Sequence, residues 1–253
     1  MRIHRGAAVG YLTFMKSISD RVGLLFMKQM LKTRRGQVHL LALMADAEGS
    51  GENRVFAALA KRADDPWLVR VSARHAADEA GHAELLEQRI ATLQAHRPRL
   101  PPELDILGNL DRALGGAMSK PVVDELDVMR AYGVLQVIEE RAISQLPLFI
   151  ESFAHVDEES VAVFKVLLRD ESRHLRYCHA MTRRYAPSAS VLSQWLAHVR
   201  EVEAKVFADG TMANLKYVLD ARLLEVPWWA RALWRTLSLI GAIATPPRTT
   251  GFA

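Results

Sequence analysis

The chain has 253 residues, of which 50% are hydrophobic and 25% charged, so it can bury one or two ordinary apolar cores and is not a low-complexity chain. Only 14 Gly and 10 Pro favour helices over a turn-rich β protein. The single cysteine, Cys178, excludes a disulfide framework, a four-cysteine zinc site and a four-cysteine iron site. A reducing, cytoplasmic compartment is therefore the default expectation.

The net charge of +4 is unevenly distributed along the chain. Residues 1–36 carry eight Lys/Arg and one acid, and residues 227–253 carry three Arg and no acid, which leaves a net charge of −6 on residues 37–226. The acidic middle argues against a DNA-binding body, whereas the basic ends suit an anionic membrane surface, suit a nucleic acid equally well, or are simply solvated helices. For the chain as a whole no nucleic-acid partner is expected. No segment reaches the ~18 uncharged apolar residues of a membrane span, and none has the features of a signal peptide.

Helical spacing of apolar residues, interrupted by Pro and Gly, divides the chain into expected helices. An amphipathic segment comes first, at about 9–33, and a Gly- and Pro-rich connection at about 97–125 has room for a short helix. Pro147 should bend the helix that contains it or fray its last turns. The expected helices cover residues 37–63, 67–96, 124–154, 158–185 and 189–206.

Short links within two helix pairs and a long link between them predict an all-α fold, a four-helix bundle with one long crossover. Extra helices are expected at both ends. We therefore expect a basic N-terminal segment (1–36), the bundle (37–186) and a C-terminal helical extension (187–253).

Two helices carry the same motif, D-E-x-x-H. The first copy is Asp78-Glu79-Ala80-Gly81-His82 and the second is Asp170-Glu171-Ser172-Arg173-His174. Residues three apart lie on one face of a helix, so each Glu-His pair can hold one metal ion. E-x-x-H alone arises often by chance, but two copies that also share the preceding Asp are improbable.

The two copies belong to an internal repeat of 92 residues, the distance from Glu79 to Glu171 and from His82 to His174. The same shift carries Glu48 onto Glu140, so a glutamate lies 31 residues before each motif glutamate. This register selects Glu48 over Glu52, and Glu140 over Glu139. The predicted ligands are Glu48, Glu79, His82, Glu140, Glu171 and His174.

Four carboxylates and two imidazoles would be costly to bury in an apolar bundle unless two divalent cations neutralise them. This donor set suits iron or manganese rather than copper(I) or structural zinc. Glu79 and Glu171 would bridge the ions, and Glu48 and Glu140 would be terminal or bridging ligands. His75 lies one turn before Glu79, but its repeat equivalent is Leu167, so we assign it to packing or to support of a ligand.

The six-ligand pattern resembles that of the ferritin-like di-iron carboxylate superfamily over about residues 38–182. The second motif is similar to the D-E-x-R-H sequence of its oxygen-activating branch. The resemblance implies two Fe ions, or a Mn/Fe pair, as cofactors. It also implies that Asp78 and Asp170 accept hydrogen bonds from ligating histidines and that Arg173 pairs with an Asp. Gly81 stands where the first copy would need an arginine, so that support is expected on one side only.

The resemblance further implies an oxidoreductase of the monooxygenase or hydroxylase type. Such an enzyme would activate O₂ to hydroxylate, oxygenate or desaturate an organic small molecule, with electrons from an external donor. The alternatives are a rubrerythrin-like peroxidase, in which Glu139 is an extra site glutamate, a ferritin-like iron-handling protein, and a non-catalytic metal-binding scaffold.

The terminal segments suggest where a substrate would come from. Trp228, Trp229 and Trp234 alternate with Arg231 and Arg235 around an apolar stripe, and residues 22–32 resemble this pattern. Both segments could lie in a membrane interface. The protein would then be peripheral on the inner membrane face and its substrate lipophilic. The alternative is that these segments pack on the bundle or form a homodimer interface.

Overall fold

The computed structural model describes residues 18–50, 55–56, 59, 65–224, 227, 229 and 233. These residues form helices and no strand, which confirms the all-α prediction. The helices with described bounds are α1 (Ile18–Met30), α2 (Arg34–Ser50), α4 (Pro66–Thr92), the 3₁₀ helix η1 (Pro102–Leu104), α5 (Ile106–Ala113), α6 (Glu125–Phe153), α7 (Glu158–Tyr185) and α8 (Ala189–Asp220).

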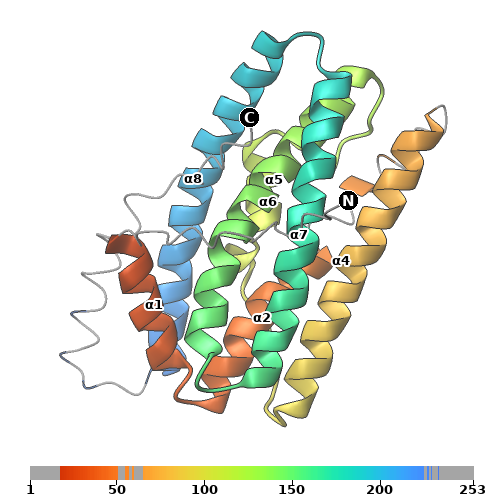
Figure 1. The fold of residues 1–253 in the computed structure, drawn as a ribbon. Coiled ribbons are helices and arrows are strands. Elements are labelled where there is room, and N and C mark those ends of the chain that lie inside the picture. Colours follow the sequence, from red (N-terminus) through yellow and green to blue (C-terminus); the bar gives the residue numbers. More distant parts are fainter. Residues whose placement is uncertain are drawn as a thin grey trace, which may run out of the picture.

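The long helices lie side by side in two pairs (Figure 1). Helix α2 packs on α4 and α6 packs on α7, while contacts between α4 and α7 join the pairs. In Figure 1, α2 and α7 run upward and α4 and α6 run downward. Residues 93–124, which include η1 and α5, therefore return the chain from the lower end of α4 to the upper end of α6. Helices α1 and α8 both pack against α6.

Short polar side chains fix where the helices begin. Asp65 accepts hydrogen bonds from the backbone N–H groups of Trp67 and Leu68, at 3.0 and 3.1 Å, and Pro66 follows it as the first residue of α4. Such caps satisfy N–H groups that have no partner within the helix. Four other helices are capped in the same way, by Asp105, Asp124, Asp157 and Ser188.

Two helix ends differ from what the sequence suggested. Of the two effects expected of Pro147, a bend or frayed last turns, the fraying does not occur, because helix α6 continues through Pro147 to Phe153. Pro147 is exposed, so water can reach the backbone carbonyl that its missing N–H leaves without a partner. Helix α8 continues to Asp220 rather than ending near residue 206, because Leu215 and Val218 are buried on its far half. Its tertiary contacts, not its local sequence, set its length.

The apolar core consists of two clusters at different levels of the bundle. One contains Leu68 of α4 and Tyr132 of α6, near the upper ends in Figure 1. The other contains Ile90 and Phe153, near the lower ends of the same two helices. Residues between these levels include buried Glu and His side chains, which places a polar layer halfway along the bundle.

None of the described helices combines the length and hydropathy needed to cross a bilayer. Residues 1–17, and Trp228, Arg231, Trp234 and Arg235 near the C-terminus, lie outside the described residues. Residues 22–32, the other segment of the membrane hypothesis, lie largely in α1, which packs on α6. Binding of either segment to a membrane stays a prediction.

Candidate metal centre

Helix α4 presents three chemically active side chains to the polar layer. His75, Glu79 and His82 are separated by four and three residues, a spacing that places them on one face of a helix. They are buried, with exposed fractions of 0%, 2% and 2%. The motif Glu and His thus point to the same interior layer, and His75 joins them from one turn earlier.

The facing helices complete the layer. Helix α7 contributes Glu171 and His174, α2 contributes Glu48, and α6 contributes Glu139. Glu48 has the most exposed side chain of the set, at 13%, and that of Glu139 is 2% exposed. The layer is therefore closed on the α6 side and slightly open on the α2 side.

In both Glu79 and Glu171, one carboxylate oxygen lies near His82 and the other lies near His174. Glu171 Oε1 lies 3.4 Å from His82 Nδ1, and its Oε2 lies 3.2 Å from His174 Nδ1. Glu79 Oε1 lies 2.8 Å from His174 Nδ1, and its Oε2 lies 3.5 Å from His82 Nδ1. Each carboxylate therefore spans the gap between the two imidazoles, the position that a ligand shared by two ions must occupy.

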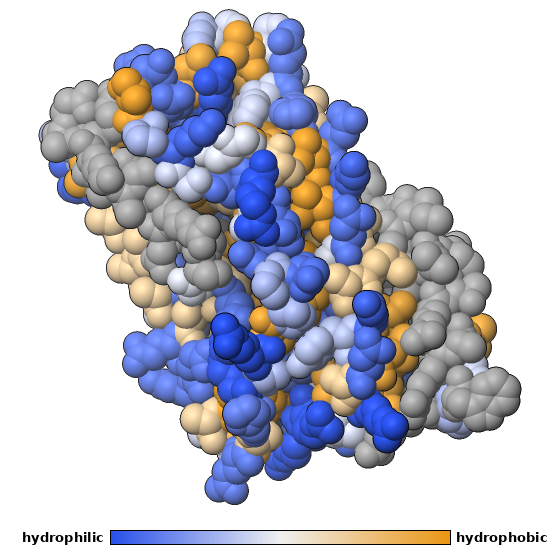
Figure 2. Space-filling view, turned by 180° about the vertical axis from the view of Figure 1, so that it is seen from behind, coloured by the Kyte–Doolittle hydropathy of each residue, from blue (hydrophilic) through white to orange (hydrophobic). Residues whose placement is uncertain are grey.

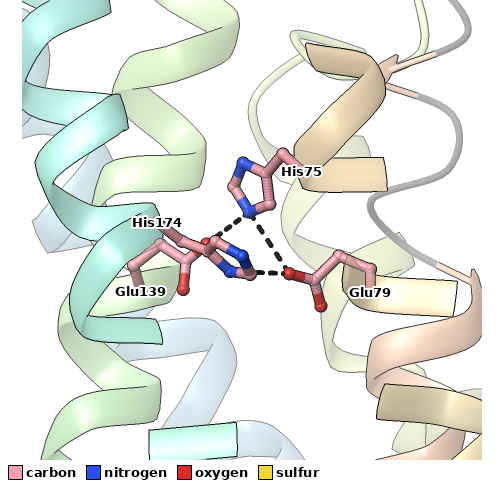
Figure 3. Close-up of side chains that lie close together, drawn as sticks. All are labelled: His75, Glu79, Glu139 and His174. Carbon is pink, nitrogen blue, oxygen red and sulfur yellow. Dashed lines mark hydrogen bonds and ion pairs between the residues drawn. The ribbon is translucent and has the colours of Figure 1, made fainter. Parts of the chain in front are cut away.

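Two terminal carboxylates extend the layer outward. Glu48 Oε2 lies 3.1 Å from His82 Nδ1. On the other side, Glu139 Oε1 lies 2.9 Å from His75 Nε2, and the His75 and His174 rings are 3.9 Å apart at their centres. Figure 3 shows His75, Glu79, Glu139 and His174 converging from α4, α6 and α7.

These side chains form two overlapping groups of candidate metal ligands. Within each group, one ligand atom from every member lies within 4.8 Å of the others. Both groups contain Glu79, so they are adjacent. The first group, here the α2-side group, is Glu48, Glu79, His82 and Glu171, and the second, the α6-side group, is His75, Glu79, Glu139 and His174.

The motif aspartates hold the histidines in a crossed arrangement. Asp78 Oδ2 lies 3.2 Å from Nε2 of His174, on the other motif, and Asp170 Oδ2 lies 3.4 Å from Nε2 of His82. Each imidazole therefore directs Nε2 to an aspartate and leaves Nδ1 facing the glutamates. Such a contact fixes the ring and its tautomer in metal sites.

Arg173 donates a hydrogen bond to each of the two motif aspartates. Its Nη2 donates to Asp78 at 2.8 Å and its Nη1 donates to Asp170 at 2.9 Å. The expectation of arginine support on one side only was therefore wrong. A single guanidinium between the helices reaches both carboxylates, so the first motif needs no arginine of its own at Gly81.

The electrostatics of the layer favour positive charge at Nδ1 of both motif histidines. Burial lowers the pKa of His82, but Glu48 and Glu79 outweigh it and raise that pKa to about 11. Burial also lowers the pKa of His174, but Glu171 and Glu79 outweigh this effect and raise that pKa to about 9. Burial raises the pKa of Glu48 well above its usual value. Protons thus relieve part of the repulsion among the glutamates.

The residues fit metal ions. The donor set is carboxylate and imidazole without thiolate, which suits iron and manganese. The Oε1 atoms of Glu79 and Glu171 are buried, and their contacts with the histidines do not have the geometry of hydrogen bonds in the described part of the chain. Buried carboxylate oxygens without hydrogen bonds are costly, and a cation held between the carboxylates and the imidazoles would remove that cost.

Glu140, predicted as a ligand, lies in neither group. Its carboxylate accepts hydrogen bonds from Arg200 Nη2 at 2.8 Å and Arg200 Nε at 3.0 Å, and one from Gln136 Nε2 at 3.1 Å. The preceding residue, Glu139, instead faces His75 and His174. Neighbouring residues of a helix point about 100° apart, so the rotation of α6 that brings in Glu139 directs Glu140 toward α8.

The structure thus brings together five of the six predicted ligands and adds two residues. For His75 there was a signal in the sequence, since H-x-x-x-E-x-x-H places all three side chains on one helix face. The repeat concealed it, because its equivalent is Leu167. Glu139 entered the sequence analysis only as the extra site glutamate of the peroxidase alternative, and the repeat favoured its neighbour Glu140 over it.

We found no significant similarity between this chain and any protein-family model, curated protein or solved structure.

Proposed function

We propose that the chain is a di-iron oxidoreductase that uses O₂ to hydroxylate, oxygenate or desaturate an organic molecule. The order of the four long helices and the crossover of residues 93–124 support a ferritin-like arrangement. The donor set supports two metal ions, with iron as the expected metal and a Mn/Fe pair as the alternative.

One observation carries the proposal: Glu79 and Glu171 each face both motif histidines with separate oxygens. A structural site for one ion would close around a single group of ligands. Two carboxylates shared between two imidazoles instead suit two adjacent ions that act together.

In this arrangement the α2-side group would hold one iron and the α6-side group the other. The pair would supply the electrons and open coordination positions that O₂ requires in order to react with an organic molecule. The protein's own part is to place the ligands and exclude bulk water. Asp78, Asp170 and Arg173 keep Nδ1 of both histidines directed inward, and apolar clusters above and below the layer limit access by solvent.

The proposal is tested by loading the purified chain with Fe²⁺ without oxygen, removing free metal and measuring bound iron. We expect about two irons per chain, and rapid O₂ consumption when air and a chemical reductant are supplied. Glu79→Ala should lose both ions, because the shared carboxylate serves both. Glu84→Ala, an exposed glutamate on the same helix, is the matched control and should keep both.

Three results would contradict the proposal. Full iron content in Glu79→Ala would show that the bridging geometry holds no metal. Bound iron without any O₂ consumption would indicate a metal-binding scaffold, and selective turnover of hydrogen peroxide would indicate a peroxidase.

A further inference from the structure

A cavity of about 700 Å³ lies apart from the metal centre, between α1, α2, α6, α8 and the segment that contains η1. Small-molecule sites commonly have volumes of this order. Its inner wall is apolar and buried, with exposed fractions of 8% at Met27, 3% at Leu40, 8% at Leu148 and 4% at Leu215. Seen from behind, the molecule also shows apolar side chains at its surface among hydrophilic ones (Figure 2).

Most polar groups around the cavity are already engaged. Asp46 binds Arg97 at 2.5 Å, and Asp105 caps α5 through the Gly108 N–H at 2.8 Å. Asn214 Oδ1 lies 2.7 Å from a ring nitrogen of His39. Gln145 also lines the cavity, and its amide makes no hydrogen bond among the described residues. The cavity therefore offers apolar contact and two side-chain amides, of which that of Asn214 already uses its oxygen and that of Gln145 uses neither atom.

The charges at the cavity do not favour an ionic ligand. Asp20 and the exposed Arg99 both line it, with opposite signs. Arg141 is not part of the lining: its guanidinium lies 4.0 Å from the centre of the Phe207 ring, which does line the cavity, and donates two hydrogen bonds of 2.8 Å to Glu203. The lining aspartates repel an anionic head group, and Arg99 repels a cationic one, while Asp46 and Asp105 already have partners.

We infer that this cavity binds an uncharged lipophilic molecule, a hydrocarbon chain with a hydroxyl or carbonyl group that hydrogen-bonds the Gln145 amide. None of the candidate metal ligands lines the cavity as the structure describes it. Ala47 lines the cavity, and the next residue, Glu48, belongs to the metal centre. Helix α2 therefore borders both sites. The inference goes beyond the proposed function, because it requires no bound metal.

The direct test is calorimetric titration of the full chain, without metal and then with iron, using linear alcohols of increasing length and the matched carboxylates. Affinity for the alcohols should rise about fourfold with each added methylene until the cavity is filled. Each carboxylate should bind more weakly than its alcohol. No binding, no dependence on chain length, or tighter binding of the carboxylates would each overturn the inference.

Variants that fill the cavity test whether the alcohols bind there. Gly23 lines the cavity and a Cβ atom added there would meet nothing within 4 Å, so Gly23→Leu is the variant chosen to fill the cavity from α1. Ala204→Phe fills it from α8. Both should weaken alcohol binding at least tenfold, whereas Ala73→Leu, an exposed position on α4, should leave it unchanged. Gln145→Leu should weaken binding about fivefold through one lost hydrogen bond. Unchanged binding in both filling variants would exclude this cavity as the site.

Discussion

Glu139 and Glu140 offer a sharp test of the metal centre, because they are adjacent and chemically identical but have different surroundings. Glu139 faces His75 at 2.9 Å within the polar layer. Glu140 faces Arg200 at 2.8 Å, outside the layer. Replacing each in turn by glutamine removes the same charge with almost no change in shape. The two variants should therefore lose different properties.

For Glu139→Gln we expect a loss of metal. The α6-side group would lose one of its two carboxylates, and changes that merely support a metal ligand already lower affinity about 10–100-fold. Bound metal should fall from about two ions per chain to about one. Without metal, removing one of four crowded carboxylates reduces their repulsion, so the free energy of unfolding should fall by no more than about 1 kcal/mol.

For Glu140→Gln we expect a loss of stability. The carboxylate is 3% exposed and Arg200 is 23% exposed, so the pair is only partly accessible to water. Breaking a buried pair costs about 3–5 kcal/mol, but glutamine keeps an acceptor for Arg200 and Gln136. We therefore expect a loss of about 2–3 kcal/mol, with metal content unchanged.

The assay pairs metal analysis after anaerobic loading and desalting with urea unfolding of the metal-free proteins, followed by circular dichroism. Wild-type protein is the reference for both measurements. The reasoning is refuted if Glu140→Gln loses metal while Glu139→Gln keeps it, the result that the 92-residue repeat predicts. It is also refuted if both variants retain full metal content.

Three further predictions concern single contacts. His75→Gln should lower metal content to about one ion per chain, whereas the exposed His96→Gln should not; full metal content in the former would return His75 to a packing role. Asp170→Ala should keep the helical circular dichroism spectrum but weaken metal binding about 10–100-fold, and an unchanged affinity would show that its contact with the histidine is dispensable. Burial and the hydrogen bond to Asp65 raise the pKa of Tyr185 to about 12, above the value of about 10 in an unfolded chain. That stabilisation is complete below pH about 10 and lost as the pH rises toward 12, so unfolding of Tyr185→Phe should depend less on pH in that range.

The sequence by itself determined the helices and much of the polar layer. Asp65 followed by Pro66 marks the start of α4 because capping is a local interaction. The three-residue spacing between Glu79 and His82 places both on one helix face wherever that helix lies. Four glutamates and two histidines in an apolar bundle also pointed to cations, because the cost of burying charge does not depend on the details of packing.

Only the tertiary structure decided which neighbouring residue faces the centre. The choice between Glu139 and Glu140 depends on the rotation of α6 about its axis, which its contacts with α7 and α8 set together. The repeat could not supply this rotation, because it carries Glu139 back onto Ala47, which lines the cavity instead. The sharing of Arg173 by Asp78 and Asp170 likewise depends on the distance between α4 and α7, a property of the packed helices rather than of either sequence.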